Sequence, residues 1–215
     1  MIRHDIKGLY AITPDIADTY QLCEMTHQAL RAGVRYVQYR NKLADDRLRL
    51  TQAEALTALC RDYGARMIIN DHCDLAIMVN ADGVHLGKDD MMVSEARDYL
   101  GKNKIIGVSC YNQLKLAIGA EKQGADYVAF GAFFPSLTKT DTVKASTRLL
   151  SEAKNYLNIP IVAIGGITLE NAAKLVNYGC DALAVCHALF NTQCIRSTAA
   201  SFNQLFTDIE TISSS

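Results

Sequence analysis

Eight short apolar runs recur along the chain, and stretches with helical spacing separate them. The runs cover residues 9–12, 36–39, 67–70, 83–86, 104–109, 127–130, 161–164 and 181–185. Most of them are apolar throughout instead of alternating between apolar and polar positions, which is typical of parallel strands buried on both faces. The pattern therefore predicts strands at these eight places.

The intervening stretches repeat apolar residues every three or four positions and commonly end in a glycine, as helices do. They cover residues 19–32, 45–63, 91–100, 112–123, 147–157, 168–178 and 194–209. Strands that alternate with helices over 215 residues predict an α/β fold, a (β/α)8 TIM barrel in which residues 1–215 form a single domain. A doubly wound open sheet is the alternative, but no Gly-x-Gly-x-x-Gly follows the first run, which counts against a dinucleotide-binding fold.

Composition narrows the classes of partner. The formal net charge is −1, so the chain as a whole has no attraction for nucleic acid or an acidic membrane surface. No apolar run approaches the roughly 20 residues of a membrane span. The seven cysteines are scattered without a Cys-x-x-Cys pair, which indicates reduced cysteines in a cytoplasmic protein. We expect small-molecule partners, no nucleic acid and no membrane; the oligomeric state stays open.

Carboxylates follow the third and fourth runs. Asp71 comes directly after Asn70, and Asp89 and Asp90 come shortly after Leu86. The carboxyl ends of barrel strands form one rim, where the active sites of such barrels lie. Two carboxylates brought together there can hold a hard cation, and we predict Mg²⁺ bound by Asp71 and Asp90, with Asp89 as the alternative to Asp90. Each aspartate taken by itself is also an ordinary turn or helix-capping residue.

Basic and neutral polar side chains follow other runs at the same predicted rim. They are Gln38, Arg40, Lys42, Asn70, Ser109 and Lys139. Carboxylates and cations on one rim suit a metal-bound diphosphate. The turns at Gly165-Gly166 and Cys186-His187 suit a second phosphate, held by backbone N–H groups. The ordinary alternatives are solvated lysines at 42 and 139, hydrogen-bonded core side chains at 38 and 85, and a plain tight turn at 165–166.

At these residues the chain resembles the thiamine phosphate synthase family. The matching strings are Val-Gln-Tyr-Arg-Asn-Lys at 37–42, Asn-Asp at 70–71, Gly-Val-His-Leu-Gly at 83–87 with Asp-Asp at 89–90, Gly-Val-Ser at 107–109, Phe-Pro at 134–135 with Thr-Lys at 138–139, and Val-Ala-Ile-Gly-Gly-Ile at 162–167. The resemblance implies a (β/α)8 barrel. It also implies a transferase that joins hydroxymethylpyrimidine diphosphate to a thiazole phosphate, using Mg²⁺ and giving thiamine phosphate and pyrophosphate.

The resemblance also implies roles for individual residues. Contacts with the pyrimidine diphosphate fall to Gln38, Tyr39, Arg40, Asn41, Lys42, Asn70, Ser109 and Lys139, of which Arg40, Ser109 and Lys139 are the candidate catalytic residues. The residues expected to contact the thiazole phosphate are Ser136, Leu137, Thr138, Gly166, Cys186 and His187. Asp71 and Asp90 are expected to bind Mg²⁺. The chain departs from the family in Ser136 for a common Thr, Lys88 for Gln, and Cys186-His187 for Ile-Ser, which leaves a contact from His187 open.

The chemistry of this reaction fits the candidate residues. The pyrimidine's exocyclic carbon can lose diphosphate as a stabilised cation, which the thiazole nitrogen then attacks. The protein then needs positioning and positive charge on the leaving group, and no nucleophile of its own. Two alternatives remain from the sequence: a thiazole tautomerase-like relative on the same barrel, and a non-catalytic barrel that binds thiamine precursors.

Lys139 lies in a loop of some fifteen residues, 131–145, whose length is typical of functional loops. A lysine at this position can stabilise the charge that grows on the leaving diphosphate. Lys139→Ala should therefore lower kcat by about 10²–10³-fold, with a smaller change in KM. Steady-state kinetics of Lys139→Ala beside Lys144→Ala check this. Equal behaviour of the two variants would remove Lys139 from the mechanism.

Overall fold

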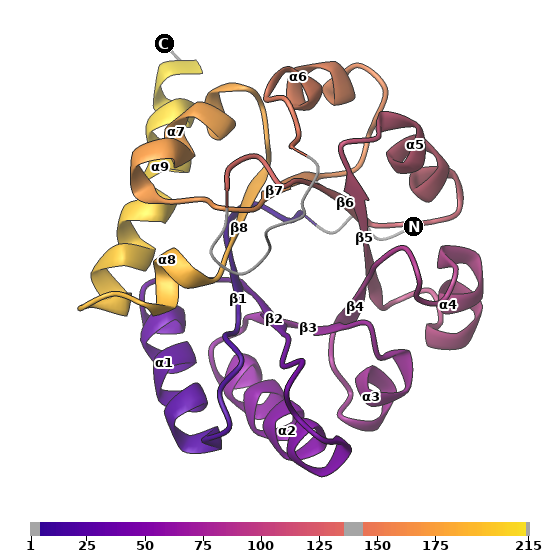
Figure 1. Cartoon of the computed structure of the whole chain (residues 1–215), viewed down its shortest axis with the longest axis vertical. Helices are drawn as coiled ribbons and strands as arrows, with labels where there is room; N and C mark the ends of the chain where they lie inside the picture. Colours follow the sequence, from indigo (N-terminus) through magenta and orange to yellow (C-terminus); the bar gives the residue numbers. More distant parts are fainter. Residues whose placement is uncertain (1–4, 136–143, 214–215) are drawn as a thin grey trace.

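In the computed structural model, which describes residues 5–135 and 144–213 with side chains up to residue 207, eight parallel strands close into a barrel (Figure 1). Each strand pairs with the next in sequence, and the last pairs with the first. The strands are Gly8–Ile12 (β1), Tyr36–Tyr39 (β2), Arg66–Asn70 (β3), Gly83–Leu86 (β4), Ile105–Tyr111 (β5), Tyr127–Phe130 (β6), Ile161–Ile164 (β7) and Ala182–Val185 (β8). The barrel prediction is confirmed, and closure excludes the open sheet.

Helices surround the barrel and alternate with its strands (Figure 1). They are Thr19–Arg31 (α1), Asp46–Asp62 (α2), Cys73–Met78 (α3), Val93–Leu100 (α4), Leu114–Lys122 (α5), Arg148–Lys154 (α6), Leu169–Asn177 (α7), His187–Phe190 (α8) and Ile195–Ser213 (α9). The sequence analysis missed α3 and α8, because helices of six and four residues are too short to display a helical period. Within the described residues, no helix is both long and apolar enough to cross a bilayer.

Two apolar layers hold the barrel together. The outer layer lies between strands and helices and contains residues such as Val37, Met67 and Val84. The inner layer fills the barrel itself and contains Tyr10, Tyr36 and Tyr127 among smaller side chains. Alternate residues of one strand enter different layers, as the two-residue period of a strand requires. Every strand is thus covered on both faces, which explains the uninterrupted apolar runs.

Three aspartates link neighbouring strands at the amino end of the barrel. Each carboxylate accepts a backbone N–H near the start of the preceding strand, at 2.7–2.8 Å, and pairs with a cation. The sets are Asp82 with the Met67 N–H and Arg66, Asp126 with the Ile106 N–H and Arg97, and Asp181 with the Ile161 N–H and Lys154. Because barrel active sites lie at the opposite rim, these links serve stability.

Asp126 should stabilise the fold more than Asp181 does, because its side chain is 8% exposed whereas that of Asp181 is 31% exposed. Hydrogen bonds to buried charged groups contribute about 1.5–3 kcal/mol, and exposed ion pairs about 0–1 kcal/mol. We expect Asp126→Ala to lower the free energy of unfolding by about 2–3 kcal/mol. Asp181→Ala should lower it by less, in urea titrations with unchanged slope. Equal losses would contradict the assigned role of burial.

Candidate functional site

Asp71 and Asp90 face one another at the carboxyl rim. Asp71 follows β3 with a φ of +64°, and its N–H donates to the His85 carbonyl at 2.9 Å. The Asp90 carboxylate accepts the Gly87 N–H at 2.6 Å, which turns the segment after β4 back toward β3. The two carboxyl groups lie within hydrogen-bonding reach of each other. The structure therefore brings together the two side chains predicted to hold a metal.

The pair fits a hard divalent cation. Burial raises the pKa of Asp71, and contact with the Asp90 carboxyl and its negative charge raise it further, while Lys42 acts in the opposite direction. A divalent cation between the two oxygen donors would relieve this repulsion. Asp89 is exposed, so Asp90 is the residue of the two that contacts Asp71. The site consists of this pair alone, since within the described ranges no three His, Cys, Asp or Glu side chains are grouped to hold a metal.

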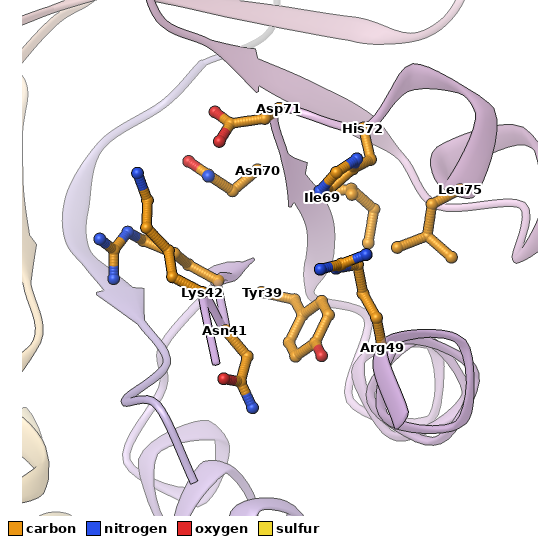
Figure 2. A pocket seen from close by; sticks show the side chains of 10 residues that line it. Tyr39, Asn41, Lys42, Arg49, Ile69, Asn70, Asp71, His72 and Leu75 are labelled. Carbon is orange, nitrogen blue, oxygen red and sulfur yellow. The ribbon is translucent and has the colours of Figure 1, made fainter. Parts of the chain in front are cut away.

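A pocket of about 220 Å³ opens beside this pair, between the carboxyl ends of β2 and β3 (Figure 2). Six predicted site residues share this cavity: Tyr39, Arg40, Asn41, Lys42, Asn70 and Asp71. Figure 2 shows Lys42 reaching toward the side of the pocket where Asn70 and Asp71 lie. The pocket thus carries both signs of charge. Two further polar lining residues were missed in the sequence, Arg49 and His72.

Tyr39 and Asn41 line the same pocket, but their polar groups bind to the protein. The Tyr39 hydroxyl donates to Gln52 Oε1 at 2.9 Å, and Asn41 Nδ2 donates to the same oxygen at 3.0 Å. Asn41 Nδ2 also donates to the Ile16 carbonyl at 3.0 Å. Gln52 is fully buried on α2 and carried no signal in the sequence, since a single glutamine on a helix is usually exposed. The three side chains fix the loop after β2 against α2.

Thr13 and Asp15, which follow β1, orient the two cations. The Thr13 hydroxyl donates to the Arg40 carbonyl at 3.1 Å and accepts the Arg40 N–H at 2.9 Å. Asp15 accepts the Lys42 N–H at 2.8 Å and pairs with the Arg40 guanidinium at 3.4 Å. The sequence interpretation took Thr13 only as the end of a strand. The rule that found Asp71, a polar residue at a strand's carboxyl end, would have found both.

Ser109 and Gln38 are the ends of one hydrogen-bonded chain inside the barrel. Ser109 Oγ lies 2.8 Å from His85 Nε2, and Gln38 Nε2 donates to the Tyr10 hydroxyl at 3.0 Å. His85 is 7% exposed and Gln38 is 3% exposed. The interpretation of His85 as a hydrogen-bonded core histidine is confirmed. Burial lowers the pKa of His85 to about 4, so its imidazole is neutral near pH 7.

Gly166 lies in the turn between β7 and α7. Its φ is +61°, and a Cβ there would lie 2.6 Å from the Phe134 carbonyl oxygen. Packing against residues 134–135 thus requires a glycine at this position. The sequence analysis connected this turn only with phosphate binding and did not predict the packing. Thr168 is the N-cap residue of α7, and Asn171 accepts the Thr168 N–H at 3.0 Å and donates to the Gly166 carbonyl at 2.9 Å.

The turn after β8 places its two predicted residues differently. Cys186 is partly buried and packs against the barrel interior, near enough to Arg40 for that charge to oppose the rise in the Cys186 pKa that burial causes. His187 is exposed, and its Nε2 lies 3.0 Å from Nδ2 of Asn191, the residue that follows α8. The remaining predicted contacts lie outside the described residues: Ser136, Leu137, Thr138 and Lys139.

Comparisons with known proteins agree on one family. A family model described as thiamine monophosphate synthase matches residues 9–189. The thiamine-phosphate synthase of Nitrosomonas eutropha is 57% identical over 96% of this chain and 97% of its own length. That of Nitrosospira multiformis is 56% identical over 95% of this chain and 87% of its own length. The solved thiamine phosphate pyrophosphorylase from Pyrococcus furiosus has a TM-score of 0.85 and 34% identity, covering 94% of this chain and 96% of that one.

Contact between Asp71 and Asp90 predicts a measurable effect of one charge on the other. Asp90→Asn removes the neighbouring negative charge, so the pKa of Asp71 should fall toward its ordinary value and keep only the part of its rise that burial causes. Asp89→Asn, the matched control, should leave it unchanged. Carbon-13 NMR titration of the Asp71 carboxyl in metal-free protein measures both, and an equal fall in the two variants would refute the pairing.

Proposed function

The chain belongs to the thiamine monophosphate synthase family, and from this premise we propose how its carboxyl rim joins a pyrimidine diphosphate to a thiazole phosphate. The family forms thiamine phosphate from these two substrates and is a family of transferases. The observation that carries the proposal is the pocket between β2 and β3, which Arg40, Lys42 and Asp71 line, with Asp90 in contact with Asp71. A metal-bound diphosphate needs cations that bind its oxygens and carboxylates that bind its metal ion.

The diphosphate binds with its oxygens toward Arg40 and Lys42. Arg40 offers a fixed fork of donors, and Lys42 a compact positive charge. Asp15 supports this arrangement, because it pairs with the Arg40 side chain and accepts the Lys42 N–H. Asn70 lines the same pocket, and Ser109 lies near the carboxyl end of β5, beside His85 of β4. Arg40, Lys42, Asn70 and Ser109 bind and orient the leaving group.

Mg²⁺ would be held by Asp71 and Asp90, and when bound it supplies positive charge to the diphosphate oxygens. Two carboxylates suit Mg²⁺ in particular, because this ion commonly takes one or two protein carboxylates and completes its coordination with phosphate oxygens and water. The raised pKa of Asp71, caused by burial and by Asp90, supports a pair that a cation stabilises. Asp89 is exposed and is not part of this proposal.

The reaction proceeds by dissociative substitution. The bond between the pyrimidine's exocyclic carbon and the diphosphate oxygen breaks, and the electron pair leaves with the diphosphate. The thiazole nitrogen then donates its lone pair to the carbon cation, which forms the new C–N bond. Arg40 and Lys42, with Lys139 from the undescribed segment, stabilise the charge that grows on the leaving group. The thiazole phosphate binds at the turns around Gly166 and Cys186-His187, through backbone N–H groups that precede α7 and α8.

The partners in this proposal are two small molecules. A cytoplasmic location remains a prediction, supported by seven cysteines that are all free. The tautomerase-like and non-catalytic alternatives would need neither a carboxylate pair for a metal ion nor cations for a diphosphate. Metal-dependent release of pyrophosphate therefore separates them from the synthase.

The test is incubation with both substrates and varied Mg²⁺, with pyrophosphate and thiamine phosphate measured together. The unchanged protein should release the two products in equal amounts. Asp71→Asn and Asp90→Asn should each lower the rate at limiting Mg²⁺ by at least about 10²-fold, since each removes a ligand that positions charge on the leaving group. Asp89→Asn should stay within about threefold of the unchanged protein. Full activity of Asp71→Asn at limiting Mg²⁺ would overturn the metal assignment.

A further inference from the structure

A chain of polar side chains crosses the interior of the barrel. It runs from Gln38 on β2 to Tyr10 on β1, Tyr127 on β6, His85 on β4 and Ser109 on β5. The successive distances are 3.0, 2.8, 2.9 and 2.8 Å. Five strands thus contribute one side chain each. The first four members are buried, and Ser109 is half-buried.

The barrel is built to admit this chain. Gly107 on β5 stands between His85 and Tyr127 in register, and a Cβ there would overlap the Tyr127 ring. The absence of a side chain at Gly107 lets the phenol cross the barrel interior. Tyr127 then stacks on His85 at 5.6 Å and meets Tyr10 edge to face at 5.9 Å. Its hydroxyl lies between the other two polar groups.

Proton counting gives the chain one direction. Gln38 presents an N–H to Tyr10, so the Tyr10 hydrogen has Tyr127 as its acceptor. Tyr127 accepts from Tyr10, so its own hydrogen has His85 Nδ1 as its acceptor. A neutral His85 that accepts at Nδ1 carries its hydrogen on Nε2, and this N–H donates to Ser109 Oγ. Reversing any one bond alone would place two donors or two acceptors against each other inside the barrel, which is costly.

We propose that Gln38, Tyr10, Tyr127 and His85 are positioning residues that hold Ser109 as a hydrogen-bond donor toward the substrate at the rim. Because Ser109 Oγ accepts from His85, its single hydrogen remains for another acceptor. That acceptor is an oxygen of the leaving diphosphate. This identification of the acceptor rests on the proposed function. The buried chain thereby fixes which way a rim hydroxyl points before substrate binds.

The tautomer of His85 tests the direction without substrate. The protein has five histidines in total. Nitrogen-15 NMR of histidine-labelled protein distinguishes a protonated ring nitrogen from an unprotonated one. The His85 signals are those lost in His85→Gln. Hydrogen on Nε2 is expected. Hydrogen on Nδ1 would mean that the whole chain runs from Ser109 to Gln38, and the proposal would be wrong whatever reaction the protein catalyses.

A double-mutant cycle tests the connection to catalysis. Ser109→Ala should lower kcat by about 10²-fold, the effect of removing one donor to developing charge. Tyr127→Phe should lower kcat by about tenfold, less than full removal of the donor, with little change in KM for the pyrimidine diphosphate. In the Ser109→Ala background, Tyr127→Phe should lower kcat by less than about twofold, because the group on which it acts is gone. Effects that multiply in the double variant would overturn the proposal.

Tyr36→Phe is the matched control. Tyr36 also lies inside the barrel, packs on Tyr10 at 6.1 Å and donates its hydroxyl to the Asp5 carbonyl at 3.2 Å, outside the polar chain. It should lower stability without lowering kcat, and an equal loss of kcat would reduce Tyr127 to a structural role. If the unchanged protein releases no pyrophosphate, the proposed function fails by itself, and the His85 tautomer still decides the direction of the chain.

Discussion

Closure of the eight-stranded barrel determines where each charged group of the molecule lies. Because all strands are parallel, their amino ends meet at one rim and their carboxyl ends at the other. Aspartate serves opposite purposes at the two rims. Asp126 at the amino rim binds a backbone N–H and Arg97, so its charge is compensated within the protein. Asp71 at the carboxyl rim contacts the Asp90 carboxyl, and this contact adds to the effect of burial in raising the pKa of Asp71.

Charges at the carboxyl rim are sorted by backbone contacts between neighbouring loops. Asp15 compensates part of the charge of Arg40 and accepts the Lys42 N–H, so it holds the loop after β2 against the loop after β1. The turn that carries Asp90 closes on its own Gly87 N–H and so keeps its carboxylate near Asp71. A rim with both signs of charge can take a diphosphate and its metal together, whereas a purely basic rim would bind any anion.

The strands were predictable because burial on both faces imposes a continuous apolar run, and the structure shifts their ends by two residues at most. The rim residues Arg40, Lys42, Asn70 and Asp71 were predictable for the same reason, since a strand's end marks its rim. Contacts across the barrel were not. Tyr10 and Tyr127 are 117 residues apart, and no local pattern records that their hydroxyls meet. The packing of Gly166 against Phe134 was not predictable either, because it depends on another loop.

The interior of the barrel connects stability to the chemistry at the rim. An apolar interior would avoid the cost of burying hydroxyl, amide and imidazole groups, and satisfied polar networks gain little over it in net stability. Here the buried groups bind one another in a chain that ends at half-buried Ser109. A change deep in the barrel can therefore alter the direction of a hydrogen bond at the surface without moving a strand. Tyr127 and Gly107 consequently constrain each other, since the phenol needs the space that glycine leaves and the chain needs the phenol.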